Sequence, residues 1–554
     1  MKTVFVAQNS SYTHTNSAVR ILARCLEDNG LEAEIVETTI GDRGGAIALC
    51  EKLYEKKGDI YAFSVYIWNR SEQLLAASLI KKLIPGCTVV FGGPEVSFED
   101  ETFLDQNPFI DYVIRGEGEE AIVEIANGKC EKGFVDFGVY EKFSSSCEPY
   151  FSYPEKYGET CGKLIYYETT RGCPFSCSYC LSSVKKKGEC VRSKPAELVK
   201  QELSHLMSED IKAIKLVDRT FNYDRKRAYE LFSYMIEKSA ENLDENGKYR
   251  GATIHFEICA ALLDEETMTL LEKAPENLFR FEIGVQTANP ASLKAIGRAD
   301  DTGKILENVK RLKEKTNIEL HLDLICGLPN DSFSDIRNSF NKVYGNCHKL
   351  QMGFLKLLPG TALKNEAGKY KMKSLDVPPY TVLETDKISF FEMMTLTRIA
   401  EVAEKFSDAE SGFDTAISLM IKNCESPFDF YFELSRFLNE KGSVSSKKLY
   451  CEILGFANCY FEGKKALIND IKESLRYDYL MSNQGRCPFE TERIYTEDEE
   501  KYLAFAKKQF IHSDIRNTQK IFVPALEAHL FSFDCENVYF IDRKNRLCFK
   551  SKRP

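Results

Sequence analysis

Residues 170–180 read TRGCPFSCSYC and are the most informative stretch of the chain, because they contain three cysteines within eight residues. Three residues separate Cys173 from Cys177, and two separate Cys177 from Cys180. A structural zinc site needs four ligands, which usually come as two separated pairs. Three thiolates on one loop instead suit three corners of an iron–sulfur cluster, leaving the fourth iron open to a small chelating molecule. A zinc knuckle and three unrelated core cysteines are the alternatives.

The bulk composition is that of an ordinary globular protein. The chain has 554 residues, of which 43% are hydrophobic and 29% charged, and this length allows three or four domains. A net charge of −10 argues against non-specific nucleic-acid binding, which needs a basic surface. We find no signal peptide, no apolar run of membrane-spanning length and no disulfide framework, so we expect a cytoplasmic protein with no membrane partner.

Short apolar runs alternate with helical patterns on both sides of the cysteine motif. Residues 1–127 predict strands at 3–7, 34–37, 60–66, 87–91 and 112–114. Strands that alternate with helices indicate a doubly wound parallel sheet, which binds ligands beyond the carboxyl ends of its strands. Several candidate ligand contacts follow these strands: His14, Ser64, Gly92, Gly93, Gly116 and Glu117.

The remainder of the chain divides into three parts. Residues 128–160 lack periodicity and are interpreted as a linker. Residues 161–365 predict six strands, at 164–169, 214–217, 254–258, 279–284, 319–325 and 350–357, and hence a partial (βα)6 barrel with its chemistry at the strand ends. Residues 375–554 predict a mainly helical domain with helices at 391–405, 428–439, 446–460 and 464–480. A helix at 498–508 follows, then strands at 538–541 and 547–550 around a turn at 542–545.

The cysteine motif resembles the signature of radical S-adenosylmethionine (SAM) enzymes, including Tyr179 before the last cysteine. The resemblance implies that Cys173, Cys177 and Cys180 hold a [4Fe–4S] cluster whose open iron chelates SAM. It also implies reductive cleavage of SAM to a 5′-deoxyadenosyl radical, with electrons from a donor such as a flavodoxin or ferredoxin. Tyr179 would then pack near the adenine, with an ordinary core position as the alternative.

Residues near the predicted barrel strand ends supply candidate SAM contacts. The stretches 282–298 and 321–329 resemble the coproporphyrinogen-dehydrogenase-like branch of these enzymes. In that branch the matching glutamine and aspartate meet the SAM ribose, and the arginine meets the SAM carboxylate. The expected contacts in this chain are Asp218, Glu257, Glu282, Gln286, Arg298 and Asp323. Each of these residues could instead form a salt bridge or cap a helix. In addition, the Gly-Gly-Glu sequence that is usual in related enzymes near the position of Asp218 is absent.

The first 127 residues, placed directly before this motif, resemble the cobalamin-binding domain of B12-dependent radical SAM proteins. A flavodoxin-like domain that has lost its ligand is the alternative. His14 does not lie in the Asp-x-His-x-x-Gly pattern of histidine-ligated cobalamin domains. A loop contact from His14 to the corrin or its tail is therefore favoured over ligation of cobalt.

Together these patterns resemble an uncharacterised subgroup of B12-binding radical SAM proteins that has a C-terminal domain of unknown function. The resemblance implies methylation of an unactivated carbon through methylcobalamin, on a small-molecule or peptide substrate. A radical SAM oxidoreductase or rearrangement enzyme is the first alternative, and a non-catalytic cobalamin or iron–sulfur regulator is the second. Aromatic residues of the C-terminal region, such as 428–432, could line a substrate pocket, but helix packing is favoured.

Overall fold

The computed structural model describes residues 1–145, 160–184, 191–298, 301–407, 411–442, 444–482 and 488–489, together with the backbone of three strands beyond residue 518. Its contacts divide the chain into two units. The first unit comprises residues 1–336 and 352–390, and the second comprises residues 337–351 and 391–554. The helix predicted at 498–508 and nearly all of the turn predicted at 542–545 lie outside the described residues.

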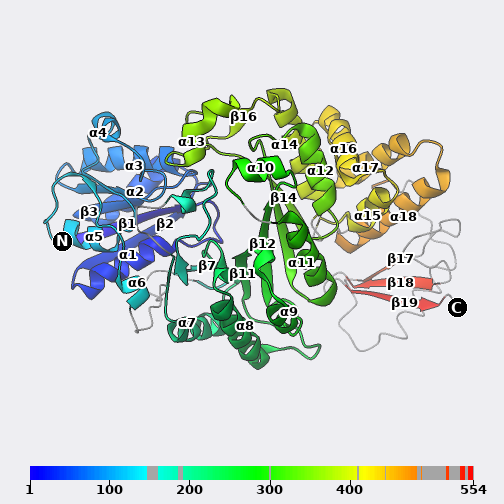
Figure 1. The fold of residues 1–554 in the computed structure, drawn as a ribbon, viewed down its shortest axis with the longest axis horizontal. Coiled ribbons are helices and arrows are strands. Elements are labelled where there is room, and N and C mark those ends of the chain that lie inside the picture. The colour runs from blue at the N-terminus through cyan, green and yellow to red at the C-terminus, as the bar shows by residue number, and fades with distance from the viewer. Residues whose placement is uncertain are drawn as a thin grey trace. The chain divides into compact units, whose positions relative to one another are not determined.

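The first sheet is a six-stranded parallel sheet with the order β2-β1-β3-β4-β5-β6 (Figure 1). Its strands are β1 Lys2–Asn9, β2 Glu32–Thr39, β3 Ile60–Ser64, β4 Thr88–Gly92, β5 Tyr112–Ile114 and β6 Gly133–Val135. The order reverses between β1 and β3, which is where doubly wound sheets bind their ligands. The five predicted strands are confirmed. The linker prediction missed β6, whose three residues are too few for periodicity to reveal.

Helices cover both faces of this sheet because its strands are apolar on both sides. Val4 and Val6 pack on one face against the helices α2 Gly45–Lys56 and α3 Arg70–Leu83. Phe5 and Ala7 pack on the other face against α1 Ser17–Asp28 and α5 Glu119–Ala126 (Figure 1). Two short helices complete this region, α4 Glu101–Gln106 and α6 Lys142–Ser145.

The second sheet is that of a six-stranded partial barrel with the order β14-β13-β12-β11-β10-β7. Its strands are β7 Leu164–Tyr167, β10 Ala213–Leu216, β11 Thr253–Ile258, β12 Phe279–Gln286, β13 Glu319–Cys326 and β14 Lys349–Phe354. The helices between them are α7 Ala196–Ser208, α8 Arg225–Ser239, α9 Glu265–Leu271, α10 Pro290–Ala295, α11 Thr302–Lys315 and α12 Phe333–Val343. The six predicted barrel strands are confirmed.

The barrel strands carry polar residues on their less buried face. Along β12, Phe279, Phe281, Ile283 and Val285 are buried, and the residues between them are only partly buried. The pattern has period 2, as expected of a strand whose two faces differ. Short elements that the sequence did not predict surround the barrel: β8 Thr170–Arg171, β9 Arg192–Ser193, α13 Ala362–Glu366, β15 Lys373–Ser374 and β16 Val382–Glu384.

The second unit is mainly helical. It contains α14 Phe390–Ser407, α15 Asp414–Lys422, α16 Pro427–Lys441, α17 Ser446–Tyr460 and α18 Lys465–Ser482, and a three-stranded antiparallel sheet of β17 Gln519–Phe522, β18 Asn537–Asp542 and β19 Leu547–Lys552. The predictions missed α15 and β17. Phe428, Phe430 and Tyr431 are fully buried, and the Tyr431 hydroxyl lies 3.1 Å from that of Tyr344. These aromatic residues therefore pack in the helical core, which is the alternative that the sequence favoured.

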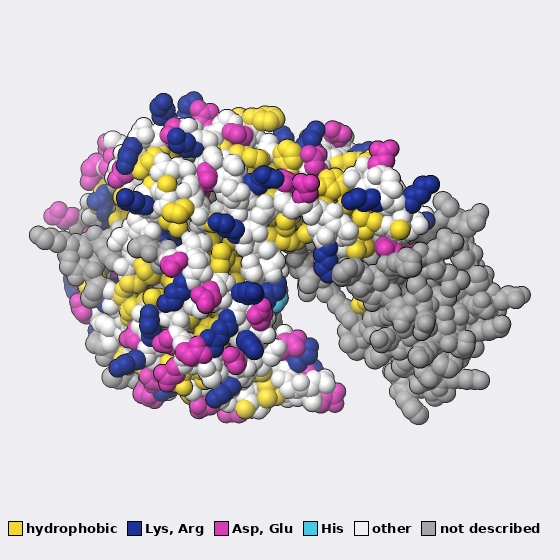
Figure 2. Space-filling view, turned by 45° about the vertical axis from the view of Figure 1, so that its right-hand side comes forward, with side chains coloured by type: hydrophobic (Ala, Val, Ile, Leu, Met, Phe, Trp, Pro, Cys, Tyr) yellow, Lys and Arg dark blue, Asp and Glu magenta, His cyan; other side chains and the backbone are white. Residues whose placement is uncertain are grey.

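On the face shown in Figure 2, positive and negative side chains are interspersed over the described residues. This agrees with a net charge of −10 and gives no support to nucleic-acid binding through that face. Within the described part of the chain, every helix is too short or too polar to cross a bilayer.

Candidate cluster and cofactor site

The cysteine loop follows the two-residue strand β8 at the start of the barrel. Cys173 and Cys177 are buried, Cys180 is partly exposed, and none of the three forms a disulfide. The Cys180 amide donates to the carbonyl of Cys177 at 3.1 Å. The Ser183 hydroxyl lies 2.6 Å from the Cys177 carbonyl and 2.7 Å from that of Cys180, so one side chain holds both ends of this turn.

The described residues include no set of three His, Cys, Asp or Glu side chains already arranged around a metal ion. Ligation by the three cysteines thus stays a prediction. The donor set itself fits an iron–sulfur cluster, because it consists of three cysteine thiols outside any disulfide, on one loop whose backbone is anchored.

Hydrogen bonds join the cysteine loop to the end of α10 and to α13. The Ser178 amide donates to the Ile296 carbonyl at 2.9 Å, and the Ser178 carbonyl accepts from the Leu363 amide at 2.8 Å. Gly297 has φ +69°, and a Cβ there would lie 3.1 Å from the carbonyl oxygen of Ser176. Only glycine adopts this conformation readily and permits so close an approach.

Tyr179 packs beside the apolar cluster that includes Leu293, Ile296 and Leu357. Burial raises the pKa of the Tyr179 phenol, and the nearby Arg298 guanidinium opposes that shift. Tyr179 and Arg298, which are over a hundred residues apart in the sequence, therefore lie together beside the cysteine loop.

The end of β12 is an unusual piece of backbone. Gln286 has φ +68°, and the pairing with β13 shifts register between Gly284 and Gln286. A Cβ on Gly284 would lie 2.0 Å from Nε2 of the Gln286 side chain, so this side chain folds back over the strand. Arg298 donates to the Gly284 carbonyl at 2.7 Å. Left-handed backbone at a non-glycine residue is costly and is concentrated at ligand sites.

Two buried acceptors at this edge have no hydrogen-bond partner among the described residues, namely Oε1 of Gln286 and Oδ1 of Asp323. Asp323 lies on β13 opposite Gly284, one strand away from Gln286. Buried polar atoms are nearly always paired in native proteins. These two oxygen atoms therefore fit a ligand that donates hydrogen bonds, such as the ribose and ammonium groups of SAM.

Glu257 and Asp323 are held close to the protonated state. Burial raises the pKa of Glu257 to about 7. Burial, with the charges of Glu282 and Glu257, raises the pKa of Asp323 to about 7 as well. Each carboxyl is thus able to donate or accept a proton near neutral pH, as a ligand-binding or catalytic group would.

Glu282 was predicted to contact SAM, but in the structure its carboxylate is paired with side chains of the barrel. Its Oε2 lies 3.1 Å from Nε2 of His255 and 3.1 Å from Nζ of Lys215. The hydrogen bond from His255 and the charge of Lys215 lower the pKa of Glu282 to about 2. The Glu282 carboxylate is therefore paired within the barrel, and the sequence missed both of its partners because they lie on other strands, His255 on β11 and Lys215 on β10.

Asp218 also differs from its predicted role. Its carboxylate is fully buried and accepts from the Thr169 amide at 2.8 Å, the Thr170 amide at 2.7 Å and the Thr169 hydroxyl at 2.5 Å. Burial raises the pKa of Asp218 to about 6. Since both oxygens are occupied, Asp218 fixes the backbone that leads into the cysteine loop and is not exposed to bind a SAM ammonium group.

As the pH rises from about 4 to about 7, we expect the free energy of unfolding to decrease, in part because of Asp323. A carboxyl whose pKa is raised on folding stabilises the fold below its unfolded pKa and loses that contribution as pH rises through the folded value. Asp323→Asn should therefore raise the thermal midpoint of cofactor-free protein at pH 8 and have little effect at pH 4.

The matched control is Asp111→Asn. Burial alone would raise the pKa of Asp111, but ion pairs with Lys132 and Lys81 lower it overall. Its carboxylate therefore stabilises the fold above the unfolded pKa, and Asp111→Asn should lower the midpoint at pH 8. Equal shifts of the same sign in both variants would contradict the assignment of Asp323.

The predicted cobalamin contacts at the carboxyl edge of the first sheet have different surroundings. A Cβ at Gly116, where φ is +76°, would have no heavy atom within 4 Å. Gly93 has φ +110° and leaves no room for a Cβ, which would lie 2.5 Å from the Val65 carbonyl oxygen. Ser64 is buried, and its hydroxyl lies 3.3 Å from the Asn16 amide nitrogen. The open backbone at Gly116 leaves room for a ligand such as a corrin at this edge, whereas the backbone of Gly93 packs against Val65.

His14 links this edge to the barrel. Its Nδ1 lies 2.7 Å from the Tyr166 hydroxyl, and the residue forms a β-bridge with Leu164 at the start of β7. Burial, with the charges of Lys215 and Lys212, lowers the pKa of His14 and favours the neutral ring. Contact with cobalamin remains a prediction for His14, and the structure adds that Tyr166 occupies one ring nitrogen.

A buried ion-pair network joins the loop after β5 to the cysteine loop. Arg171 lies 2.8 Å from Glu117, 2.6 Å from Glu119 and 3.0 Å from Glu168. Glu117 also pairs with Arg192, so its carboxylate is occupied by the barrel and not open to a corrin. Arg171 is 13% exposed, which makes this an interior contact between two parts of the first unit.

A second contact joins the loop after β4 to the segment before β16. The Tyr380 hydroxyl donates to the Glu95 carboxylate at 2.5 Å, and Arg70 lies 3.0 Å from the same oxygen. Phe98 packs directly over Gly360, whose hypothetical Cβ would lie 2.3 Å from the ring. The loops after β1, β4 and β5 therefore all contact the barrel.

Three family models match consecutive parts of the chain. They are the B12 binding domain over residues 3–126, the radical SAM superfamily over residues 167–343, and a protein family of unknown function, DUF4080, over residues 368–538. The chain is a B12-binding radical SAM protein. The match to the radical SAM superfamily implies that the protein uses SAM and a [4Fe–4S] cluster. The match to the B12 binding domain implies that it binds cobalamin.

Curated relatives of this B12-binding radical SAM protein include two methyltransferases. An uncharacterized methyltransferase, PH0819 from Pyrococcus horikoshii, is 28% identical over 47% of this chain and 58% of its own length. The cobalamin-dependent radical SAM methyltransferase TokK from Streptomyces tokunonensis is 25% identical over 71% of this chain and 60% of its own length. The chain thus spans about three fifths of the length of these relatives.

Solved structures share the fold. The radical SAM methyltransferase TsrM from Kitasatospora setae matches with a TM-score of 0.55 and 18% identity, over 69% of this chain and 80% of that one. The cobalamin-dependent SAM radical enzyme OxsB matches with a TM-score of 0.50 and 12% identity, over 86% of this chain and 79% of that one.

Sequence reasoning missed the residues that join the two cofactor regions. Arg171, Glu119, Glu95 and Tyr380 were not predicted as site residues. One signal was available, because Arg171 immediately precedes the cysteine motif and residues 115–119 read RGEGE, which complements its charge.

Proposed function

We propose that this protein is a cobalamin-dependent radical SAM enzyme that methylates an unactivated carbon of a small-molecule or peptide substrate. One observation carries the proposal. Arg171, two residues before Cys173, is ion-paired with Glu117 and Glu119 at the carboxyl edge of the first sheet. The edge that suits a corrin is thus held beside the loop that suits the cluster.

The residues divide into three groups by the cofactor they would hold. Cys173, Cys177 and Cys180 would hold the cluster, and Gln286, Asp323 and Arg298 would bind SAM with Tyr179 near the adenine. Glycine backbone at residues 92, 93 and 116 would face the corrin. When bound, the cluster and SAM supply a 5′-deoxyadenosyl radical, and cobalamin supplies the methyl group.

The contribution of the chain is orientation. Asp218 fixes the backbone before the cysteines with three hydrogen bonds, and the Ser178 backbone joins the loop to the end of α10 and to α13. Arg171 then fixes that loop against the cobalamin-binding region. Holding reacting groups in one geometry accounts for a large part of the rate in such enzymes.

The proposal is tested by anaerobic reconstitution of the cluster and cobalamin. The holoprotein is given SAM with a labelled methyl group, a low-potential donor such as flavodoxin or ferredoxin, and a cell extract as the source of substrate. We expect 5′-deoxyadenosine together with a labelled product. 5′-Deoxyadenosine without any labelled product would favour an oxidoreductase or rearrangement enzyme, and release of neither would favour a regulator.

Trp68 offers a direct test of cobalamin binding. It is the only tryptophan of the chain, it stacks on Tyr66 at 4.5 Å, and its indole nitrogen donates to the Gln8 carbonyl at the end of β1. Because a corrin absorbs tryptophan emission, hydroxocobalamin bound at this edge should quench Trp68 fluorescence saturably. Free tryptophan at the same concentrations corrects for absorption by the solution, and quenching no greater than that control would contradict cobalamin binding at this edge.

A further inference from the structure

The segment that follows β14 is strongly basic, although the chain as a whole is acidic. Residues 356–373 contain five lysines and a single acidic residue, Glu366, in a chain whose net charge is −10. The segment includes α13 and the 3-10 helix Ala367–Tyr370, and it reaches the start of β15. A local positive charge of this kind needs an explanation separate from the composition of the chain.

This basic segment lies against the cysteine loop. The Leu363 amide donates to the Ser178 carbonyl at 2.8 Å, and Lys364 directly follows Leu363. Leu363 and Tyr370 also belong to the apolar cluster against which Tyr179 packs. The backbone that carries these lysines is therefore the same backbone that contacts the loop expected to hold the iron–sulfur cluster.

Most of the five lysines have no acidic partner. Among the described residues, Lys373 alone of the five forms an ion pair, with Glu384 at 2.5 Å. The charge of the other four is not offset by a neighbouring carboxylate of the described structure. Three of these four are exposed and Lys364 is partly exposed; they are Lys356, Lys364, Lys369 and Lys371.

A further exposed lysine comes from α10. Lys294 follows Leu293, which belongs to the same apolar cluster as Leu363 and Tyr370. Each of the other unpaired lysines is likewise next in sequence to a member of that cluster, so the apolar residues gather the lysines around one part of the first unit. The lysine surface is defined here as Lys294, Lys356, Lys364, Lys369 and Lys371.

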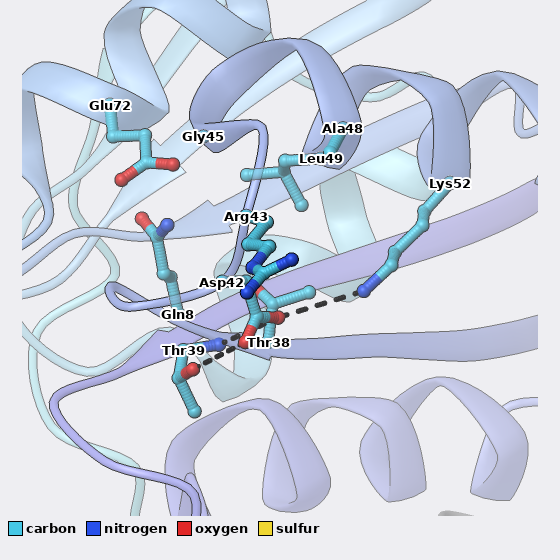
Figure 3. A pocket seen from close by; sticks show the side chains of 10 residues that line it. All are labelled: Gln8, Thr38, Thr39, Asp42, Arg43, Gly45, Ala48, Leu49, Lys52 and Glu72. Carbon is cyan, nitrogen blue, oxygen red and sulfur yellow. Dashed lines mark hydrogen bonds and ion pairs between the residues drawn. The ribbon is translucent and has the colours of Figure 1, made fainter.

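The cations around the cavity shown in Figure 3 are arranged differently. That cavity has a volume of about 230 Å³ and lies at the carboxyl ends of β1 and β2. Lys52 lies 3.7 Å from Asp42 there, and the Glu72 carboxylate also lines the cavity (Figure 3). Acidic groups thus offset the cations of the cavity, whereas the lysine surface keeps a net positive charge.

We propose that the lysine surface is the docking site of a small acidic electron-transfer protein that reduces the cluster. A positive patch that faces an acidic partner speeds their encounter and fixes their orientation. On docking, one electron passes from the reduced carrier to the oxidised cluster, so the carrier is oxidised and the cluster is reduced without transfer of a proton or a covalent bond. The inference rests on the proposed function, because it requires a cluster at the cysteine loop.

The first test measures docking in the absence of all cofactors. The full-length protein without cluster, SAM or cobalamin is titrated into fluorescently labelled flavodoxin, an acidic carrier, at low ionic strength, and anisotropy reports binding. Saturable binding is expected, and it should weaken as salt is added, because salt screens exposed charges. The triple substitution Lys364→Gln, Lys369→Gln and Lys371→Gln should weaken the affinity about tenfold.

The matched control removes three lysines from α2 and its C-cap, by Lys52→Gln, Lys56→Gln and Lys57→Gln. The net charge changes equally in both triple variants. Lys57 has φ +51° and Lys371 has φ +47°, so each set includes one residue with left-handed backbone. Lys52 and Lys56 are paired with acidic residues. The control variant should bind flavodoxin with the affinity of the wild type.

The second test separates docking from the chemistry of the cluster. In protein with a reconstituted cluster, reduced flavodoxin should reduce the cluster more slowly in the lysine-surface variant than in the wild type. Dithionite, a small reductant that needs no docking surface, should reduce both proteins equally and support equal formation of 5′-deoxyadenosine. If the wild type forms no 5′-deoxyadenosine even with dithionite, the proposed function is contradicted, whereas a failure confined to docking appears in the anisotropy.

Three results would overturn the docking proposal: no saturable binding to the wild type, equal affinities of the two triple variants, or binding that salt leaves unchanged. Transfer RNA is added in a competition experiment at low ionic strength. Displacement of flavodoxin by the RNA would assign the lysine surface to a nucleic acid and overturn the proposal as well. Retention of flavodoxin in the presence of RNA would support it.

Discussion

Cys177→Ala is expected to abolish both assembly of the cluster and formation of 5′-deoxyadenosine. Cys177 is the central thiol of the motif, it is buried, and its carbonyl is held by Ser183 and by the Cys180 amide. A cluster left with two ligands has no stable attachment, and without it SAM has no reductant. Iron and acid-labile sulfide analysis, an electron paramagnetic resonance spectrum and product chromatography measure the three consequences.

The matched control for this variant is Cys161→Ser. Cys161 is an exposed cysteine of the same unit that lies outside the motif and contacts Asp210. Its substitution should leave iron content and 5′-deoxyadenosine at wild-type levels. A Cys177→Ala protein that still forms 5′-deoxyadenosine would refute the radical SAM assignment of the loop, whatever cobalamin does.

Arg171→Met is expected to cause the largest loss of stability and to uncouple the two cofactors. The substitution leaves the carboxylates of Glu117, Glu119 and Glu168 beside one another without their shared cation. Breaking a buried ion pair from one side costs about 3 kcal/mol. Urea unfolding followed by Trp68 fluorescence measures this loss in the first sheet, which contains one partner loop of Arg171.

In the same variant the ratio of 5′-deoxyadenosine to methylated product should rise. The cysteine loop keeps its own hydrogen bonds to Ile296 and Leu363, so SAM cleavage persists while its alignment with the cobalamin-binding edge is lost. A loss due only to misfolding would reduce both products together. Chromatography of the two products from one reaction, run below the unfolding temperature, distinguishes these cases.

Arg311→Met is the matched control for the charge. Arg311 also forms a two-pronged pair, with Glu265, but the Glu265 side chain is 77% exposed. Exposed ion pairs contribute at most about 1 kcal/mol, so the urea midpoint should move little. A loss of stability in Arg311→Met equal to that in Arg171→Met would contradict the special position of Arg171.

Periodicity and motif spacing were enough to predict the architecture. The alternation of short apolar runs with helical patterns predicted five of the six strands of the first sheet and all six strands of the barrel. What escaped prediction was short, such as β6 and the β8–β9 pair, whose two or three residues in each strand carry no period. Their pairing depends on neighbours that are distant in the sequence.

The predicted SAM contacts show what a sequence motif does not predict, namely whether a side chain is already paired within the protein. Gln286, Asp323 and Arg298 come together near the cysteine loop, with unpaired acceptors on Gln286 and Asp323, and their contact with SAM stays a prediction. Asp218 and Glu282 also lie on the barrel, but hydrogen bonds and ion pairs within the protein occupy them. A sequence shows where an acidic residue stands in the chain. Whether its carboxylate oxygens can still bind a ligand depends on which backbone amides and cations lie beside them in the folded protein.

Local sequence patterns were sufficient to predict the cofactors, because three cysteines at this spacing and a doubly wound domain before them can be recognised without knowledge of packing. The contact between the two cofactor regions, in contrast, became visible in the folded structure alone. Arg171 and Glu117 are 54 residues apart, and their 2.8 Å contact exists because two loops from different sheets converge. Charge pairing of this kind depends on distance in space, which sequence order does not encode.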